Sequence, residues 1–372
     1  MFFEVVMKNL NACAALFIMC LSLLLIPINS YPCTSFCLKV DDKPMVGKNY
    51  DWSIGNGLIM VNKRGVQKIA AQYRSDAYGK PVHWNSKFGS VTFNQFGREF
   101  PMGGINESGL VVELLMLAET LYPEPDPRPS ISMLQWVQYQ LDKFRKTQEV
   151  IESIFHLRIV PPLMGPEVHY FVCDRGGNCA SIEFLDGRAV CHTGKTMPAR
   201  VLTNNTYEDS LRAWKNGKQS HPNQYYGAGR FVHAARLLED YDSDRSGNPV
   251  NHVFSILKSV SQGSFTKWSI VYDIPNLTIY FKTLSNEKVR YVSLRDFDFS
   301  CESPVLVLDV NSDFQGNVRN MFTKYTKKVN RMLVESAFRD MSFGGLDRQK
   351  VLDMVTTYPQ ASICLPQEAA QN

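Results

Sequence analysis

Alternation of apolar and polar positions predicts a β-hairpin at residues 34–52. Residues 34–40 mix apolar and polar side chains as a strand does, residues 41–44 are turn-forming, and residues 45–52 predict the returning strand. Other apolar runs predict strands at 109–117, 169–173, 180–184, 268–274, 277–283, 289–294 and 305–310. Because short, turn-rich segments join most of these runs, antiparallel sheets are favoured over a parallel one.

Helical periodicity, in which apolar residues recur every three or four positions, separates these groups of strands. It predicts helices at 131–144, 150–156, 208–215, 229–241, 250–260, 318–338 and 348–357. Since strands and helices come in groups, helices should pack outside sheets in layers, giving an α+β fold. Neither an internal repeat nor a low-complexity linker divides residues 33–372, so they are expected to form a single domain.

The first 32 residues differ in character from the rest. Lys8 precedes an apolar stretch from about residue 12 to residue 28, which the helix-breaking Pro27 interrupts. This order predicts a signal peptide and short pro-segment at 1–32, and therefore a secreted or periplasmic protein. A retained membrane anchor is the alternative, because the stretch approaches the length needed to span a bilayer. The polar residues after Pro27 favour cleavage, so stable membrane insertion is not expected after processing.

Composition narrows the range of partners. The chain has 372 residues, of which 44% are hydrophobic and 20% charged, as is usual for a globular protein. Its formal charge of +4 is spread along the chain and forms no basic stripe. Nucleic acid and anionic membrane surfaces are therefore poor candidates for partners.

Seven of the nine cysteines lie beyond the predicted signal segment. An odd number in an exported chain predicts one free thiol and up to three disulfides. Cys173 and Cys179 flank a turn sequence between two apolar runs, which predicts a disulfide across a hairpin. A zinc site made by this pair with Cys191 and His192 is disfavoured, because the spacings of known zinc motifs are missing.

Two cofactor-like motifs fail on spacing. Gly194-Lys195-Thr196 resembles the end of a phosphate-binding loop, but Ala189 stands where the first glycine is required. Residues 242–247 resemble the start of a calcium loop, yet Val253 occupies the position of the bidentate glutamate. No metal or organic cofactor is predicted.

Cys33 has the surroundings of a reactive thiol. Gly47-Lys48-Asn49-Tyr50-Asp51 stands on the returning strand of the same predicted hairpin. If the peptide bond before Cys33 is cut, the free α-amine has a pKa of about 7.7–8 and the thiol about 8.5, so one residue supplies both base and nucleophile. Asp51 could hold the amine, and the cation of Lys48 would favour the thiolate. On the hairpin alone, ordinary thiols beside a solvated strand are an equal alternative.

Further stretches carry a family resemblance. They are Cys33-Thr34-Ser35-Phe36, Gly47-Lys48-Asn49-Tyr50-Asp51-Trp52, Gly103-Gly104-Ile105-Asn106-Glu107-Ser108-Gly109-Leu110, Val201-Leu202-Thr203-Asn204-Asn205, Gly229-Arg230-Phe231 and Thr266-Lys267-Trp268-Ser269-Ile270-Val271-Tyr272. In order and approximate spacing, these resemble the choloylglycine hydrolase family of linear amide C–N hydrolases, which includes bile salt hydrolases and penicillin V acylases. The resemblance runs from Cys33 to about residue 295.

The resemblance implies a four-layer αββα sandwich and an N-terminal-nucleophile hydrolase. It implies that Cys33 attacks a linear N-acyl amide to form a thioester, and that Asp51 binds the Cys33 amine. Asn204 would donate to the oxyanion, and Arg230 would complete a charged cluster. The alternatives are that Asn204 only caps the following helix and that Arg230 only pairs with a carboxylate.

The sequence departs from this family at two positions. Lys48 stands where bile salt hydrolases and penicillin V acylases usually have arginine, which argues against either specificity. The second oxyanion contact aligns near Met116, where a backbone N–H could serve. Aromatic residues, namely Tyr73, Phe93, Tyr122 and Trp136, could line an acyl pocket, although most aromatics fill cores.

Other functions remain open. An acyltransferase of the same fold is the nearest alternative, because the stretch at 47–51 also resembles acyltransferases that act on penicillin precursors. A cysteine peptidase with a distant histidine and an inactive exported binding protein are the others. The expected partner is a small-molecule N-acyl amide, and the question of a homo-oligomer is left open.

Overall fold

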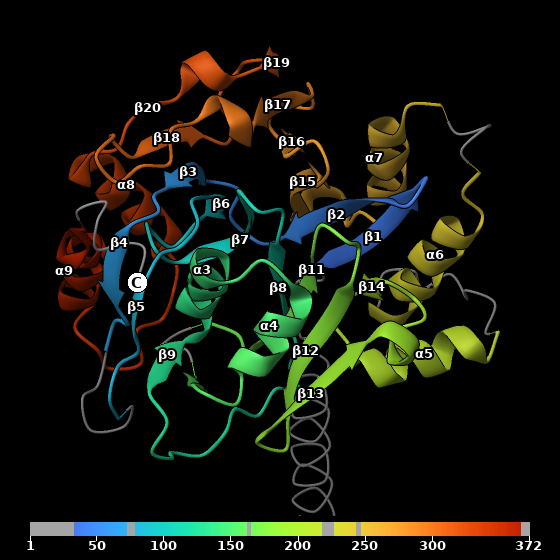
Figure 1. Cartoon of the computed structure of the whole chain (residues 1–372), viewed down its shortest axis with the longest axis horizontal. Helices are drawn as coiled ribbons and strands as arrows, with labels where there is room; N and C mark the ends of the chain where they lie inside the picture. Colours follow the sequence, from blue (N-terminus) through green and yellow to red (C-terminus); the bar gives the residue numbers. More distant parts are fainter. Residues whose placement is uncertain (1–32, 73–78, 162–164, 218–226, 243–246, 366–372) are drawn as a thin grey trace, which may run out of the picture. The chain divides into compact units, whose positions relative to one another are not determined.

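The computed structural model describes residues 33–72, 79–161, 165–217, 227–242 and 247–365 (Figure 1). All described elements belong to one compact unit, Pro32–Asn372. The predicted signal segment and Tyr73 lie outside the described residues. None of the described helices is long and apolar enough to cross a bilayer.

Two large sheets dominate this unit. The first has the order β14-β1-β2-β15-β16-β17-β19, with strands β14 (Val201–Leu202), β1 (Thr34–Val40), β2 (Lys43–Asp51), β15 (Thr266–Asp273), β16 (Thr278–Thr283), β17 (Arg290–Ser293) and β19 (Gly316–Asn317). All its neighbours are antiparallel except β17 and β19. The predicted hairpin is present, with Thr34 opposite Asn49 and Val40 opposite Lys43.

The second sheet has nine strands and is antiparallel throughout. Its order is β13 (Arg188–Thr193), β12 (Cys179–Leu185), β11 (Val168–Cys173), β8 (Val111–Met116), β7 (Pro101–Asn106), β6 (Ser90–Asn94), β3 (Leu58–Asn62), β18 (Leu306–Asp309) and β20 (Thr323–Lys324). Two small sheets, β10-β9 and β21-β4-β5, complete the strands with β9 (Ser130–Ser132), β10 (Arg158–Val160), β4 (Val66–Ile69), β5 (His83–Asn85) and β21 (Ile363–Cys364).

Helices cover the outer faces of both sheets (Figure 1). They are α3 (Met133–Lys143), α4 (Thr147–Ser153), α5 (Tyr207–Lys215), α6 (Gly227–Glu239), α7 (Pro249–Ser259), α8 (Lys327–Ala337) and α9 (Arg348–Thr357). α3 packs on β7 and β8, whereas α6 and α7 pack on β1, β2 and β15. This arrangement confirms the predicted α+β fold with two antiparallel sheets.

Local sequence sets where these helices begin. The Asn248 side chain accepts hydrogen bonds from Val250 N and Asn251 N, and Pro249 occupies the first turn of α7. The hydroxyl of Thr326 caps α8 in the same way, by accepting from Val329 N. The helix predicted at 318–338 is therefore wrong over its first part, where a 3-10 turn (Arg319–Met321) and β20 precede the cap.

Large apolar side chains fill the space between the two sheets. Trp268 stacks on Tyr50 with ring centroids 4.4 Å apart, and Phe93 meets Phe281 edge to face at 5.8 Å. Phe93, Tyr122 and Trp136 are at most 6% exposed and belong to the main core. These three aromatics therefore fill the core, and the suggested acyl-pocket role stays a prediction.

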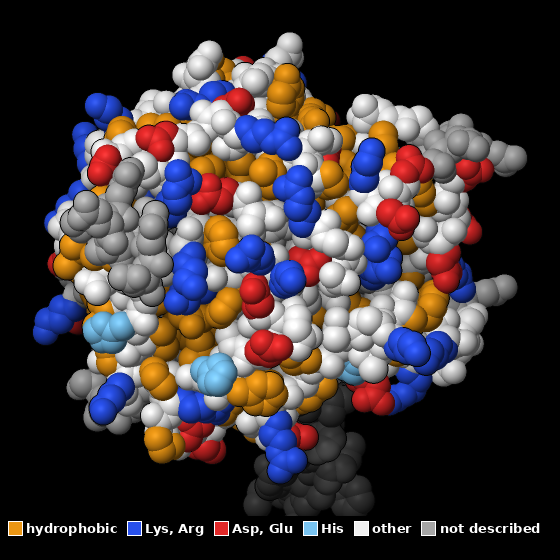
Figure 2. Space-filling model, in the orientation of Figure 1, with side chains coloured by type: hydrophobic (Ala, Val, Ile, Leu, Met, Phe, Trp, Pro, Cys, Tyr) orange, Lys and Arg blue, Asp and Glu red, His pale blue; other side chains and the backbone are white. Residues whose placement is uncertain are grey.

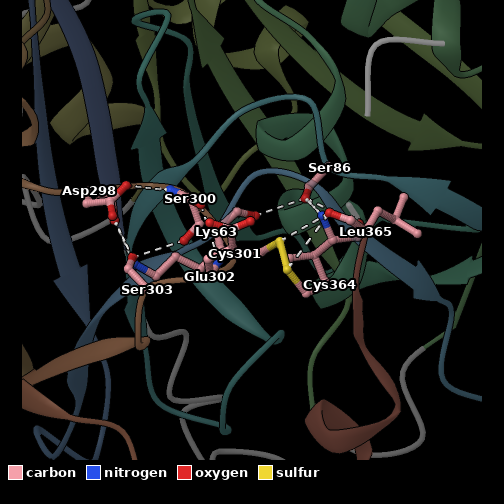
Figure 3. The surroundings of a disulfide bond; sticks show 10 residues. Lys63, Ser86, Asp298, Ser300, Cys301, Glu302, Ser303, Cys364 and Leu365 are labelled. Carbon is pink, nitrogen blue, oxygen red and sulfur yellow. Dashed lines mark hydrogen bonds between the residues drawn. A yellow bond between two sulfur atoms is a disulfide. The ribbon is translucent and has the colours of Figure 1, made fainter. Parts of the chain in front are cut away.

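The cysteines pair differently from the prediction. Cys301 and Cys364 form a disulfide (Figure 3). Cys173 and Cys179 are free buried thiols. Cys173 and Cys179 do face each other across β11 and β12, as the hairpin prediction requires. The expected disulfide between them is nevertheless absent, and their sulfur atoms lie with that of Cys37 in a group in which all three are within 4.8 Å of one another.

Candidate active site

Cys33 lies at the start of β1, where the chain enters the first sheet. Its side chain is only 4% exposed, and its thiol lies 3.8 Å from the Asp51 carbonyl oxygen. Burial raises the pKa of this thiol, while the positive charges of Lys48 and Arg230 oppose the rise. The thiol is therefore protonated at neutral pH, and attack on a carbonyl requires a base to take its proton.

Asp51 ends β2 beside Cys33, because the hairpin brings the end of β2 to the start of β1. The Thr266 hydroxyl of β15 donates to Asp51 Oδ1, whereas Asp51 Oδ2 has no partner among the described residues. Burial raises the pKa of this carboxyl to about 6, against the effects of Arg230, Thr266 and Lys48. A buried carboxylate oxygen without a hydrogen bond is costly, so a missing donor is expected at Oδ2.

Arg230 on α6 links three parts of the site. Its Nη1 donates to the Cys33 carbonyl oxygen at 2.8 Å and to the Thr34 hydroxyl at 2.7 Å. Its Nη2 donates to Asn204 Oδ1 at 3.2 Å. Burial lowers the pKa of this guanidinium to about 10, while the nearby Asp51 and Cys33 oppose that change. The planar fork of arginine thus fixes the nucleophile strand relative to Asn204.

Asn204 follows β14 and points back into the site. Its Nδ2 donates to the Met116 carbonyl oxygen at 2.7 Å, which leaves one amide hydrogen for another acceptor. The α5 helix is capped by Thr206, so the alternative in which Asn204 is only a helix cap is wrong. The nearby Thr203 hydroxyl donates to the Gly227 carbonyl at 2.8 Å and joins the Asn204 loop to the start of α6.

Lys48 projects from β2 into the space between the sheets. Its Nζ donates to the Leu114 carbonyl of β8 at 2.6 Å and lies 3.7 Å from Glu113 Oε2. Tyr272 donates to Glu113 Oε1 at 2.5 Å. Burial raises the pKa of Glu113 to about 7, against the effects of Lys48 and Tyr272. Lys48 therefore acts on Cys33 through its charge and ties the two sheets together.

Sequence reasoning missed Glu113, Thr266 and Tyr272. Glu113 is the one charged residue of β8, Val111–Met116, and a charge in so apolar a strand was a usable signal. Thr266 and Tyr272 lie within a stretch already quoted for its resemblance, but nothing in their spacing indicated which way their side chains point. The structure brings together four of the predicted residues: Cys33, Asp51, Asn204 and Arg230. Lys48 acts on this group through its charge and donates its hydrogen bond to β8.

Comparisons with known proteins agree with this architecture. Residues 33–216 match the family of linear amide C–N hydrolases called the choloylglycine hydrolase family. A penicillin V acylase from Pectobacterium atrosepticum is 26% identical over 306 residues, which cover 70% of this chain and 79% of that protein. The structure of penicillin V acylase from Agrobacterium tumefaciens superposes with a TM-score of 0.68 at 26% identity and covers 79% of this chain and 98% of that one.

A mutant conjugated bile acid hydrolase from Clostridium perfringens shares the fold, with a TM-score of 0.62 at 16% identity over 76% of this chain and 98% of that one. Fold and site together define a hydrolase that acts on carbon–nitrogen bonds in linear amides. Over residues 33–216 the chain is similar to the choloylglycine hydrolase family.

Proposed function

We propose that this protein is an exported amidase of the penicillin V acylase type whose nucleophile is Cys33, freed by removal of residues 1–32. The single observation that carries the proposal is Asp51 Oδ2, a buried carboxylate oxygen beside Cys33 for which no described residue supplies a hydrogen-bond donor. A free α-amine on Cys33 would supply that donor. The family match begins at Cys33, which supports the same boundary.

The reaction divides into acylation and deacylation. The Cys33 α-amine takes the thiol proton, and the sulfur attacks the carbonyl carbon of the substrate amide. Asn204 Nδ2 donates to the oxyanion. The protonated amine then gives its proton to the leaving nitrogen as the C–N bond breaks, leaving a thioester. Water, deprotonated by the same amine, attacks the thioester, and the sulfur leaves with the proton as the carboxylic acid is released.

Export is part of this proposal. The disulfide between Cys301 and Cys364 supports it, since disulfides persist mainly in oxidising compartments. A peptidase with a distant histidine is less well supported, because no histidine in the described ranges hydrogen-bonds to Cys33. His169, for example, is fully buried against Glu183 at 3.0 Å.

The test combines the mass of the exported protein with activity assays. The intact mass should correspond to a chain that begins at Cys33, and this species should hydrolyse members of a panel of N-acyl amides that includes penicillin V and conjugated bile acids. Cys33→Ser should reduce hydrolysis by at least about 10³-fold. Cys191→Ser, which alters a half-buried thiol on β13, is the matched control and should leave hydrolysis unchanged.

A fully active protein that retains Pro32 would overturn the mechanism, because an amide nitrogen cannot act as the base. Hydroxylamine added to the assay distinguishes the two reaction classes. A hydrolase gives mainly free acid, whereas an acyltransferase gives mainly the hydroxamate.

A further inference from the structure

Three buried thiols meet between the two sheets, away from the nucleophile. Cys37 comes from β1, Cys173 ends β11 and Cys179 begins β12. Their sulfur atoms all lie within 4.8 Å of one another, and the residues are 3%, 0% and 4% exposed, respectively. Cys191, the partner considered from the sequence, is not part of this group, and Cys37 takes its place. The cluster therefore joins strands of different sheets, which no local spacing could indicate.

The thiols have few competing partners. Apart from the other two thiols, the hydrogen-bond partner found for each sulfur among the described residues is a backbone carbonyl, at 3.9 Å from Cys37 to Leu38, 3.9 Å from Cys173 to Asp174 and 3.8 Å from Cys179 to Gly177. These contacts are long and weak, because a thiol is a poor hydrogen-bond donor. The sulfur lone pairs therefore remain available to bind a metal cation.

Positive charges flank the cluster on one side. The positive charges of Arg200 and Lys39 act on the Cys37 thiol. A pocket of about 240 Å³, lined by Cys37, Lys39 and Arg200 among others, adjoins this part of β1. The two cations would offset the negative charge that builds up when thiolates bind a metal.

We propose that Cys37, Cys173 and Cys179 bind one thiophilic d¹⁰ cation, Zn²⁺ or Cu⁺, through their three sulfur atoms. A Zn–S bond of about 2.3 Å in a trigonal arrangement requires sulfur atoms about 4.0 Å apart, which the observed limit of 4.8 Å allows. Thiolate ligands favour Zn²⁺ and Cu⁺ over harder cations. Binding releases the three thiol protons to solvent and involves no change of oxidation state.

This site would fasten β1 to the second sheet. Cys33 precedes the same strand, so the ion would hold the strand that presents the nucleophile without touching the reacting atoms. It is a structural site distinct from the proposed catalytic group.

The experiment titrates the exported protein, reduced and free of oxygen, with Cd²⁺ as a spectroscopic substitute and with Zn²⁺ and Cu⁺ in separate arms. One equivalent of Cd²⁺ should produce an ultraviolet sulfur-to-metal band, and X-ray absorption should count three sulfur ligands. Loss of an outer partner of a metal ligand weakens binding by about 10–100-fold, so Cys37→Ser or Cys179→Ser should weaken it by at least about 100-fold. The Zn²⁺ and Cu⁺ arms identify which ion binds more tightly.

Cys191→Ser and Cys33→Ser are the controls, and both should bind Cd²⁺ as the unaltered chain does. If a cluster variant fails to fold, the sulfur count on the unaltered chain still decides the question. No metal uptake by the folded, reduced protein would overturn the site. So would a band lost in Cys33→Ser and kept in Cys37→Ser, or a Cys173–Cys179 disulfide found by peptide mapping of the exported protein.

Discussion

Asp51 is a fully buried carboxylate with one oxygen bonded to Thr266 and the other without a partner in the described part of the chain. Burial without full hydrogen bonding raises the pKa of this carboxyl to about 6. In the proposed mechanism only the ionised carboxylate holds the Cys33 amine, so the rate should depend on this ionisation. The relevant quantity is kcat/KM, because it reports groups of the free enzyme.

Protonation of the Cys33 amine already lowers kcat/KM as the pH falls below about 8. We expect a second, steeper fall below about pH 6, as Asp51 also becomes protonated. Asp51→Asn should remove this second step and lower kcat/KM at pH 7 by about 10²-fold, because the amine loses its orientation. The measurement is a pH–rate profile on a hydrolysed amide. Asp313→Asn, at a surface side chain that is 85% exposed, is the control and should keep both the second step and the rate. A second step below about pH 6 that persists in Asp51→Asn would assign that step to another group.

The same variant should be more stable than the unaltered protein. The folded-state pKa of Asp51 lies above the ordinary value of 3.8, so the folded state binds the extra proton between about pH 4 and pH 6. Its contribution to stability is present below pH 3.8 and is lost as the pH rises toward 6 and beyond. Asparagine avoids that loss of up to about 3 kcal/mol at pH 7. A higher midpoint of denaturant unfolding together with a lower rate would show that Asp51 contributes to catalysis at a cost in stability.

Arg230 joins Cys33, Thr34 and Asn204 through two of its nitrogens. Lysine keeps the charge but has a single nitrogen, so Arg230→Lys cannot make all three contacts. We expect kcat/KM to fall by about 10²-fold or more, since Asn204 is no longer held in position. Arg212→Lys on α5, where the arginine is 63% exposed, is the matched control and should be silent. Equal activity of Arg230→Lys would show that only the charge matters.

At the scale of elements, β7 shows why close packing of strands requires glycine. A Cβ on Gly104 would lie 2.5 Å from the Val91 carbonyl oxygen and 2.9 Å from the Thr92 Cα of the neighbouring strand β6. Backbone atoms cannot move aside as a flexible side chain does, so β7 and β6 would have to separate. The strand carries no positive φ at this position, and the constraint is one of space alone.

We therefore expect Gly104→Ala to destabilise the protein by about 1–3 kcal/mol, measured by denaturant unfolding. Gly55→Ala is the control, because its Cβ would meet only the flexible Lys267 side chain at 3.4 Å. Similar losses in both variants would mean that the effect is a general one of glycine replacement and not of strand spacing.

The predicted strands are defined by local sequence signals, whereas the missed strands are defined by pairing with distant segments. β1 and β2 were predicted because alternation and a polar turn are local signals. β7, with its glycines, and β6 were missed, since what makes them strands is pairing with distant partners. The helix α9 was predicted with its observed bounds, Arg348–Thr357, because its Asp347 cap and apolar spacing are local.

The same division applies to the site. Cys33, Asp51, Asn204 and Arg230 could be named from short motifs, because each motif is contiguous in the chain. Their mutual contacts, such as Arg230 to Cys33 across α6 and β1, depend on the tertiary fold. The cysteine pairing was mispredicted for that reason, since Cys37 and Cys364 are placed by the sheets and not by sequence spacing.

At the scale of the whole molecule, the surface charge is mixed and the C-terminal part is linked to the rest of the fold. On the face shown in Figure 2, basic and acidic side chains are interspersed over the surface. The chain's last helices pack as a separate apolar cluster with Phe100, Val334 and Val355. Beyond them β21 pairs with β4, and Leu365 N donates to the Gly65 carbonyl at 2.8 Å. Residues 363–365 thus attach the C-terminal part to β4 and the residue before it.

The Cys301–Cys364 disulfide closes that attachment over a sequence separation of 63 (Figure 3). Loop-closure entropy for such a length corresponds to about 4 kcal/mol, and measured effects are often smaller. The double variant Cys301→Ser/Cys364→Ser should therefore lower the free energy of unfolding by about 2–4 kcal/mol in denaturant titrations. Hydrolysis at 25 °C should be unchanged, because Cys33, Asp51 and Arg230 make no contact with this link. Cys191→Ser is the control for loss of a thiol outside a disulfide. If a folded double variant loses hydrolysis, the C-terminal helices act on the site. If its free energy of unfolding is unchanged, the pairing of β21 with β4 already holds this part of the chain.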